Sequence, residues 1–409
     1  MAAIDQAVQR LAPVVRRTPL EFNDRLTKVI GQPVWLKRED AQLCRSYKVR
    51  GAYNLIASLS AEQRRRGVVC ASAGNHGQGV ALACSQLQIR GRIFLPSNTP
   101  RQKLQRIEAI GGPWVELITV GNSYDQAGTA AHEDCRRTRA IYAHPFDDPR
   151  TIAGQGTVAV EIAHQFEGDI GTVVVPVGGG GLIAGMALWL HEHRPAIRVV
   201  GAEPAGAASM SAALAHGAPV DLDPIDTFVD GAAVGRVGEL TFPIVRDLVD
   251  EIVVVSEGAV CSEMLDLYQT DGIIAEPAGA LASAAARLIV SHDADPVVCI
   301  VSGGNNDVSR YAEIVERSLL YLGLRHYFLV TFSQEPGSLR SFLNNVLIEG
   351  EDIVVFEYIK KNNRETGPAL VGIELENASN LTGLLHRMDS SPLQIEPVSP
   401  GSPLFSFLL

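Results

Sequence analysis

The chain has 409 residues, 46% of them hydrophobic and 20% charged, which is typical of a globular protein with two or three domains. Its 35 basic and 46 acidic residues give a formal net charge of −11. This balance argues against nucleic acid and anionic membranes as partners, since both attract concentrated Lys and Arg. Only six of the basic residues are lysine, so chemistry that needs a nucleophilic amine has few candidates.

Up to residue 320, short β-branched runs alternate with alanine-rich helical stretches, which predicts an α/β fold with mostly parallel strands. Predicted strands are Val34–Lys37, Val68–Ala71, Arg92–Leu95, Trp114–Thr119, Val173–Val177, Arg198–Ala202, Ile252–Val255 and Val297–Val301. Predicted helices include Gln78–Gln86, Arg101–Ala109, Tyr124–Arg137, Leu182–His191 and Ala278–Val290. These strands could form one long sheet or two smaller ones, and the stretch 145–150 is expected to be a loop between lobes.

The remaining elements follow the order βαββαβ, which predicts a ferredoxin-like α+β module. Strands are expected at Arg325–Phe332, Asp352–Ile359, Ala369–Glu376 and Leu393–Val398, with helices at 336–347 and Leu381–Met388 and a polar turn at Lys361–Gly367.

Cysteine usage and the N-terminus point to a reducing, cytoplasmic setting. The six cysteines include no Cys-x-x-Cys pair, and most lie in apolar runs, so we expect free thiols and neither disulfides nor a zinc site. The N-terminus lacks the basic and apolar regions of a signal peptide. The uncharged stretch Gly171–Leu190 contains Pro176 and four glycines, which favours a strand, a turn and a buried helix over a membrane span.

A glycine-rich loop, Gly178-Gly179-Gly180-Gly181-Leu182, joins a predicted strand to a predicted helix. Converging backbone N–H groups and the helix N-terminus would form a phosphate cradle there. The same stretch fits the dinucleotide pattern Gly179-x-Gly181-x-x-Ala184, with Glu203 near the place of a ribose-binding acid. A nicotinamide-dependent oxidoreductase is therefore a rival hypothesis.

Two further loops follow predicted strands. Ser72-Ala73-Gly74-Asn75-His76 combines small residues with polar side chains and could form a nest for a carboxylate. Ser302-Gly-Gly-Asn305 places a hydroxyl at the end of a buried strand. Because parallel sheets bind ligands at the carboxyl ends of their strands, these loops could converge on one crevice.

Lys48 lies in the segment Ser46-Tyr-Lys-Val-Arg-Gly-Ala52. A lysine in a partly buried, apolar site has a lowered pKa and can form a Schiff base, although a surface position is commoner for any one lysine. A phosphate cradle, a carboxylate nest, a hydroxyl and an amine together indicate pyridoxal 5′-phosphate (PLP) and an amino-acid substrate.

Taken together, these motifs resemble the threonine dehydratases (threonine ammonia-lyases) of the fold-type II PLP family, which is tryptophan-synthase-β-like and has two open, mostly parallel sheets. The stretches Phe146-Asp-Asp148, Ile152-Ala-Gly-Gln-Gly156 and Ala275-Glu-Pro-Ala-Gly-Ala280 are similar to this family as well. The tail resembles the ACT-like regulatory domain of the biosynthetic branch. The resemblance implies a PLP-dependent catalytic domain at 1–320, with a smaller lobe at roughly 55–150, and one ACT-like domain at 325–409.

The resemblance also implies residue roles. Lys48 would bind the cofactor covalently and act as the catalytic base, Asn75 would bond its 3′-oxygen, Gly178 to Leu182 its phosphate, and Ser302 would face its pyridine nitrogen. The loop from Ser72 to His76, including Ala73 and Gly74, would bind the substrate carboxylate. No divalent metal site is expected, because Ser209 stands where a family pattern beginning at Glu203 has an Asp in relatives that bind a divalent cation. A monovalent cation stays open, and no metal ligand is assigned.

The expected function is PLP-dependent deamination of L-threonine to 2-oxobutanoate and ammonia in isoleucine biosynthesis, with L-serine as a possible further substrate. Isoleucine and valine are the expected effectors, and a homotetramer the expected assembly. Serine dehydratase, racemase and threonine synthase enzymes of this family share many of these motifs, so their activities remain alternatives. The nicotinamide oxidoreductase and a non-catalytic amino-acid sensor are less favoured alternatives.

Overall fold

The computed structural model describes residues 2–289, 295–358, 365–399 and 405. Contacts divide the chain into a first unit, Met1–Asp307, and a second unit, Val308–Leu409. Each unit has its own sheets and its own hydrophobic core.

The first unit contains two separate open sheets, which settles the choice between one long sheet and two smaller ones. The larger has the order β1-β2-β10-β7-β8-β9 and is parallel except where β1 pairs with β2. Its strands are β1 (Leu20–Phe22), β2 (Val34–Arg38), β7 (Thr172–Pro176), β8 (Arg198–Pro204), β9 (Glu251–Val255) and β10 (Val297–Val301). The parallel β5-β4-β3-β6 sheet contains β3 (Val68–Ala71), β4 (Gly91–Leu95), β5 (Val115–Thr119) and β6 (Ile141–Tyr142).

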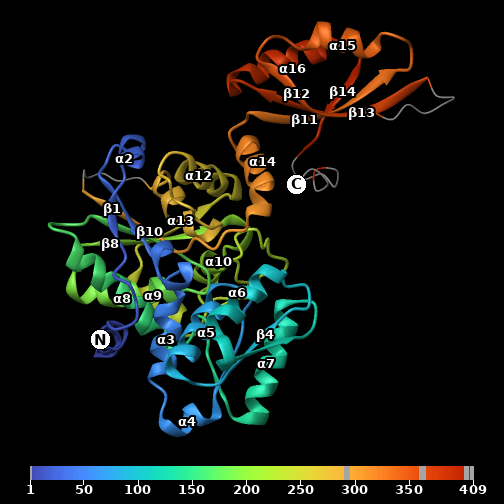
Figure 1. Ribbon diagram of the computed structural model, residues 1–409. Coiled ribbons are helices and arrows are strands. Elements are labelled where there is room, and N and C mark those ends of the chain that lie inside the picture. The colour runs from blue at the N-terminus through green and yellow to red at the C-terminus, as the bar shows by residue number, and fades with distance from the viewer. Residues whose placement is uncertain (1, 290–294, 359–364, 400–404, 406–409) are drawn as a thin grey trace. The chain divides into compact units, whose positions relative to one another are not determined.

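Helices flank both sheets, and Figure 1 shows α4, α5, α6 and α7 around the smaller one. The helices of the first unit are α1 (Ala2–Leu11), α2 (Asp24–Ile30), α3 (Lys48–Ala57), α4 (Ala61–Arg66), α5 (Asn75–Leu87), α6 (Arg101–Gly111), α7 (Tyr124–Thr138), α8 (Pro149–Gln165), α9 (Gly181–His193), α10 (Ser209–His216), α11 (Thr241–Leu248), α12 (Glu257–Gln269) and α13 (Pro277–Ala286). Every residue of β3, β7 and β10 is buried, as expected for parallel strands covered on both faces.

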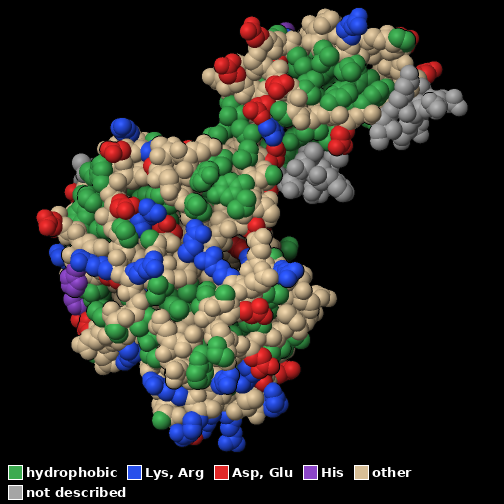
Figure 2. Space-filling view, viewed as in Figure 1, with side chains coloured by type: hydrophobic (Ala, Val, Ile, Leu, Met, Phe, Trp, Pro, Cys, Tyr) green, Lys and Arg blue, Asp and Glu red, His purple; other side chains and the backbone are tan. Residues whose placement is uncertain are grey.

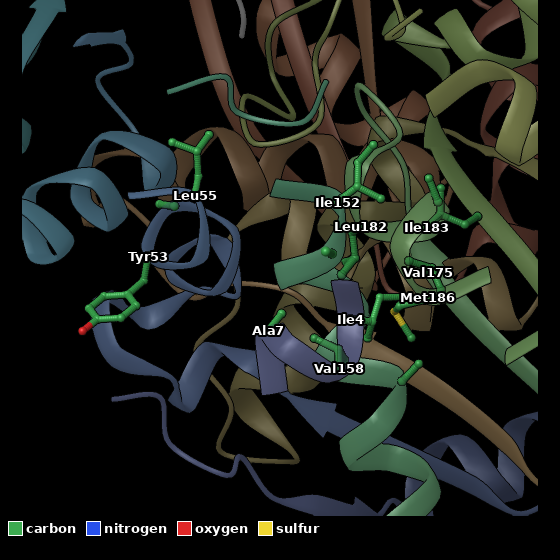
Figure 3. Close-up of a cluster of buried hydrophobic side chains, with 14 of the residues drawn as sticks. Ile4, Ala7, Tyr53, Leu55, Ile152, Val158, Val175, Leu182, Ile183 and Met186 are labelled. Atoms are coloured by element: carbon green, nitrogen blue, oxygen red, sulfur yellow. The ribbon is translucent and has the colours of Figure 1, made fainter. Parts of the chain in front are cut away.

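The core of the first unit joins segments that are far apart in the sequence. Figure 3 shows Ile4 of α1 beside Val158 of α8 and Met186 of α9, with Leu55 of α3 farther away in the same buried cluster. All four side chains are almost fully buried. This packing fixes α3, and with it Lys48 at the first position of that helix, against the body of the unit.

The second unit has the strand order β12-β13-β11-β14, with every pair antiparallel. Its elements are α14 (Tyr311–Tyr321), β11 (Arg325–Ser333), α15 (Ser338–Val346), β12 (Glu351–Tyr358), β13 (Thr366–Leu375), α16 (Leu381–Asp389) and β14 (Gln394–Pro397). The βαββαβ order after α14 confirms the ferredoxin-like prediction. β13 already includes Thr366 and Gly367, which were predicted as turn, and residues 361–364 of that turn lie outside the described residues.

Two local differences from the sequence prediction concern the first unit. α5 begins at Asn75, earlier than predicted, so Asn75 and His76 belong to its first turn. α8 begins inside the expected loop, because Pro149 occupies a first-turn position and the side chain of Asp148 accepts the N–H of Arg150 as an N-cap. The stretch Gly171–Leu190, in contrast, contains β7, a glycine turn and the start of α9, as predicted.

The six cysteines are all free thiols, and four of them, Cys70, Cys84, Cys261 and Cys299, are buried. No helix in the described part of the chain is both long and apolar enough to cross a bilayer.

Candidate active site

The loop between β7 and α9 requires glycine for steric reasons. Gly180 has φ +90°, and a Cβ on Gly179 would lie 2.4 Å from the ring of Phe146. The N–H groups of Gly178 to Leu182 donate to no acceptor within the described residues. Consecutive free amides at the N-terminus of a long helix form a binding site for an anion such as a phosphate.

The loop between β3 and α5 contributes a second set of free donors. The N–H groups of Asn75, His76 and Gly77 have no acceptor among the described residues, and Gly74, the N-cap, provides no side-chain cap. The space beside Gly74 is open. The Oγ of Ser72 accepts the N–H of Gly74 at 3.3 Å and stabilises the turn. This arrangement can bind a carboxylate.

His76 is a neutral, structural member of this loop. Burial, then the charge of Lys48, lowers its pKa to about 3. Its Nε2 lies 2.7 Å from the carbonyl oxygen of Ala143 and donates to it, since a carbonyl can only accept. His76 therefore ties α5 to the segment before α8.

Lys48 lies where these loops meet. Its Nζ donates to the carbonyl oxygen of Pro145 at 3.4 Å, and the next residue, Phe146, packs against Gly179 of the glycine loop. On its other side, the N–H of Tyr47 donates to the carbonyl oxygen of Ser302 at 3.1 Å. Lys48 is thus connected to the loop that follows β7 through Phe146, and to the loop that follows β10 through the backbone of Tyr47.

Ser302 directly follows the buried strand β10, as predicted, and is itself buried. Its Oγ donates to the carbonyl oxygen of Ala278 at 3.1 Å and keeps its lone pairs for a ligand. β10 and β7 are neighbours in the sheet, and the chain runs from β7 to β8 on one side while β10 lies on the other. Ligand crevices form at such switch points.

Sequence reasoning gave Glu276 no role, yet it is a buried acid inside the site. Its Oε1 accepts the Nδ2–H of Asn75 at 2.6 Å, and the Oδ1 of Asn75 accepts from Asn305 Nδ2 at 2.6 Å. Burial and, to a smaller extent, Asp230 raise the pKa of Glu276 to about 7. A charged residue within the otherwise apolar stretch 273–282 was the signal that could have revealed it.

Basic side chains accompany the site. Figure 2 shows Lys and Arg side chains gathered in the middle of the drawn face of the first unit. Burial, followed by the neighbouring charge of Arg45, lowers the pKa of Arg106. The guanidinium groups of Arg45 and Arg106 therefore interact, and together they produce a positive potential that attracts anions.

A network of buried ion pairs stabilises the elements that position Lys48. Arg50, two residues further along α3, is fully buried and bonds Glu39 and Glu161. Lys37 of β2 is also fully buried and bonds Glu161 at 2.7 Å. Because Arg50 and Lys37 outweigh the opposing effect of burial, the pKa of Glu161 is lowered. These bonds connect β2, α3 and α8, the elements that position Lys48.

The carboxylate of Glu203, which the nicotinamide hypothesis assigned to a ribose, is occupied by hydrogen bonds within the protein. It is fully buried, and its carboxylate accepts the N–H groups of Met210 and Ser211 at 2.6 and 2.9 Å and the hydroxyl of Ser211. An acid occupied in this way at the start of α10 cannot bind a ribose. Within the described residues, no three His, Cys, Asp or Glu side chains are grouped to hold a metal ion.

Comparisons with known proteins agree with this geometry. Residues 11–303 match the family of pyridoxal-phosphate dependent enzymes, and residues 316–408 match the C-terminal regulatory domain of threonine dehydratase. The match to PLP enzymes, together with the occupied Glu203, overturns the nicotinamide hypothesis.

Several curated proteins named biosynthetic L-threonine dehydratase are similar over the whole chain. The Mycobacterium bovis protein is 56% identical, covering 100% of this chain and 96% of its own length. The Bacillus subtilis protein is 47% identical, covering 99% of this chain and 96% of its own length.

Two solved structures each match 78% of the chain. Tomato (Solanum lycopersicum) threonine deaminase isoform 2, in its processed form, has a TM-score of 0.74 at 39% identity, covering 78% of this chain and 88% of that one. Maize serine racemase has a TM-score of 0.72 at 35% identity, covering 78% and 98%. The chain therefore belongs to the biosynthetic L-threonine dehydratases, PLP-dependent lyases of fold-type II that carry a C-terminal regulatory domain.

Proposed function

We propose that this chain deaminates L-threonine to 2-oxobutanoate and ammonia, the first step of isoleucine biosynthesis. The supporting observation is the position of Lys48: its Nζ bonds Pro145, whose neighbour Phe146 packs on the glycine loop, and its charge acts on His76 in the loop proposed for the carboxylate. Other described lysines have different roles: Lys37 is bound in the buried ion network, Lys103 pairs with Asp230, and Lys28 is exposed.

The residues present fit PLP. Five free amides from Gly178 to Leu182 match a phosphate, and the Nζ of Lys48 is free of any carboxylate within the described residues. Asn75 would donate to the 3′-oxygen, and the neutral hydroxyl of Ser302 would face the pyridine nitrogen. When bound, PLP supplies an electron sink that stabilises negative charge at the substrate Cα.

The protein's own groups would then divide the work on threonine. The amides at the start of α5, with Ser72, Ala73 and Gly74 beside them, hold the carboxylate and orient Cα. Lys48 Nζ removes the Cα proton as a general base. The β-hydroxyl leaves as water with a proton, and the released enamine takes up water to give 2-oxobutanoate and ammonia.

The test is to record the visible absorption of the purified protein and then add L-threonine. We expect absorption from bound PLP that changes with threonine, with 2-oxobutanoate and ammonia formed in equal amounts. L-Serine should react as a poorer substrate. Altered absorption without keto acid, but with inverted serine, would favour racemase chemistry, and a protein that remains colourless after PLP is added would contradict the proposal.

We further propose that the second unit, with its ACT-like sheet, binds isoleucine as an inhibitor and valine as its antagonist, and that the enzyme acts as a cytoplasmic homotetramer. The match of residues 316–408 to a regulatory domain supports the first part. Threonine turnover measured with increasing isoleucine, and then with valine added, tests the effectors. Light scattering of the full-length enzyme tests the assembly.

A further inference from the structure

Glu276 occupies a position that the reaction described above does not use. It is the N-cap residue of α13, but its side chain makes no cap bond to that helix. Instead it projects into the site, where its Oε1 lies so close to Gly303 that a Cβ there would approach it to 2.2 Å. The carboxylate of Glu276 thus lies directly against the backbone of Gly303, in the loop that follows β10.

The contacts of Glu276 determine which way the amide of Asn75 points. An ionised carboxylate only accepts hydrogen bonds, so the atom of Asn75 facing it at 2.6 Å must be Nδ2. At the other end, the Oδ1 of Asn75 accepts from Asn305 Nδ2, which also donates to the carbonyl oxygen of Cys44 at 2.7 Å. Nδ2 carries two hydrogens and Glu276 takes one, so the second remains for a ligand.

We propose that Glu276 is a positioning residue that locks the amide of Asn75, so that Asn75 presents an N–H rather than a carbonyl to the 3′-oxygen of PLP. This inference rests on the proposed role of Asn75. Two bonds define the orientation of the Asn75 amide, the one to Glu276 and the one from Asn305. Without the carboxylate only the bond from Asn305 remains, so the flipped orientation becomes more populated and turns an acceptor toward an oxygen that is itself an acceptor. Cofactor affinity falls as a consequence.

Ionisation of Glu276 therefore matters for cofactor binding. The charged groups that act on it are Asp230, which precedes α11, and Lys103 and Arg106 of α6. Burial and Asp230 raise its pKa to about 7, while the bond from Asn75 and the charge of Lys103 oppose them. Protonated Glu276 can donate to Oδ1 of Asn75 and permits the wrong orientation, so the PLP affinity of the wild type should decline as the pH falls below neutrality.

The test is a double-mutant cycle on the full-length enzyme, with the dissociation constant of PLP as its readout. We expect Glu276→Gln to weaken PLP binding about tenfold, the size of one hydrogen bond to a charged group. In an Asn75→Ala background the same substitution should change binding less than about twofold, because its target is gone. Glu263→Gln is the matched control: Glu263 is equally buried but bonds Arg25 and Arg287 away from the site.

Glu276→Asp separates contact from charge. The shorter side chain keeps the negative charge but does not reach Asn75, so we expect it to bind PLP as weakly as Glu276→Gln and to lose the pH dependence below neutrality. Wild-type affinity in Glu276→Asp, or an equal loss from Glu276→Gln with and without Asn75, would overturn the inference. Failure of the wild type itself to bind PLP would instead refute the proposed function, so the two failures are distinguishable.

Discussion

The two units of the chain use their sheets in opposite ways. In the first, the parallel strands β3, β7 and β10 are buried throughout, and the polar chemistry lies in the loops after them. In the second, β12 alternates between more and less exposed positions, as in a sheet with one face packed on helices. A buried parallel sheet brings remote loops to one edge, which produces a catalytic crevice, whereas the antiparallel module has no such edge.

Charge is distributed differently as well. The first unit buries Arg50 and Lys37 completely with their acids, while the ion pair of Arg317 and Glu313 in the second unit keeps 20% and 27% of its side chains exposed. On the face drawn in Figure 2, most Lys and Arg side chains belong to the first unit. Arg50 and Glu39, both fully buried, thus lie beside the proposed active site of the first unit, and the following predictions test whether catalysis belongs to that unit.

The largest effect is expected at Lys48. Lys48→Ala should reduce threonine turnover by at least about a thousandfold, since it removes the general base. Lys28→Ala, on the exposed side of α2, is the control and should retain full activity. The rate of 2-oxobutanoate formation is the measurement, with circular dichroism to confirm folding. Substantial turnover by Lys48→Ala would place the chemistry elsewhere.

Removal of the second unit addresses the comparison directly. A chain ending at Asp307 should deaminate threonine at a rate within about threefold of the full chain, a change well below the tenfold that about 1.4 kcal/mol of barrier represents. It should lose all response to isoleucine. Initial rates with and without isoleucine measure both effects. Retained inhibition would place the effector site in the first unit.

Buried and half-exposed ion pairs should differ in their contribution to stability. Arg50→Met leaves Glu39 and Glu161 without their partner and should lower the free energy of unfolding by about 3–5 kcal/mol. The matched change Arg317→Met should cost less than about 1 kcal/mol. Urea unfolding followed by fluorescence and circular dichroism measures both, and equal losses would contradict the contrast drawn between the two units.

The glycine loop should tolerate no side chain. In Gly179→Ala the new methyl group would meet the ring of Phe146 at 2.4 Å, so we expect PLP binding to weaken about tenfold, equivalent to about 1.4 kcal/mol. Gly128→Ala is the control, because Gly128 lies within α7 and a Cβ there meets nothing within 4 Å. It should stabilise the protein by about 0.5–1 kcal/mol. Unchanged PLP affinity in Gly179→Ala would remove the loop from the cofactor site.

A smaller effect should appear in the pH dependence of stability. The folded protein keeps the proton of Glu276 up to about pH 7, whereas the unfolded chain releases it near the ordinary value of 4.5. Between these values rising pH favours unfolding, by at most about 1.4 kcal/mol per pH unit. From pH 5 to pH 7 the free energy of unfolding should therefore fall more in the wild type than in Glu276→Gln. Parallel curves would contradict the raised pKa.

Local patterns explain why most of the fold could be predicted. The β-branched runs that precede Ser72, Gly178 and Ser302 are strands buried over their full length, and turn residues follow each of them. The helix that begins at Lys48 was missed, because Gly51 and Tyr53 weaken the helical pattern and only packing against the core stabilises it. Helix propensity alone could not predict that this segment is helical.

Long-range partners were beyond the reach of the sequence. Arg50 bonds Glu161 across 111 residues and Lys37 bonds it across 124, and no local spacing indicates such pairs. The role of Glu276 depends likewise on Asn75, 201 residues away. What could be predicted was the chemical type of the site, and what could not was the set of buried groups that holds it in place.

The most direct test of the account is to trap the cofactor on the protein. Borohydride reduction of the purified enzyme, followed by proteolysis and mass spectrometry, identifies which of the six lysines carries it. We predict a pyridoxyl group on the peptide containing Lys48 and on no other. A label on a different lysine, or none after incubation with PLP, would contradict the central claim that Lys48 joins the loops of the first unit into a PLP site.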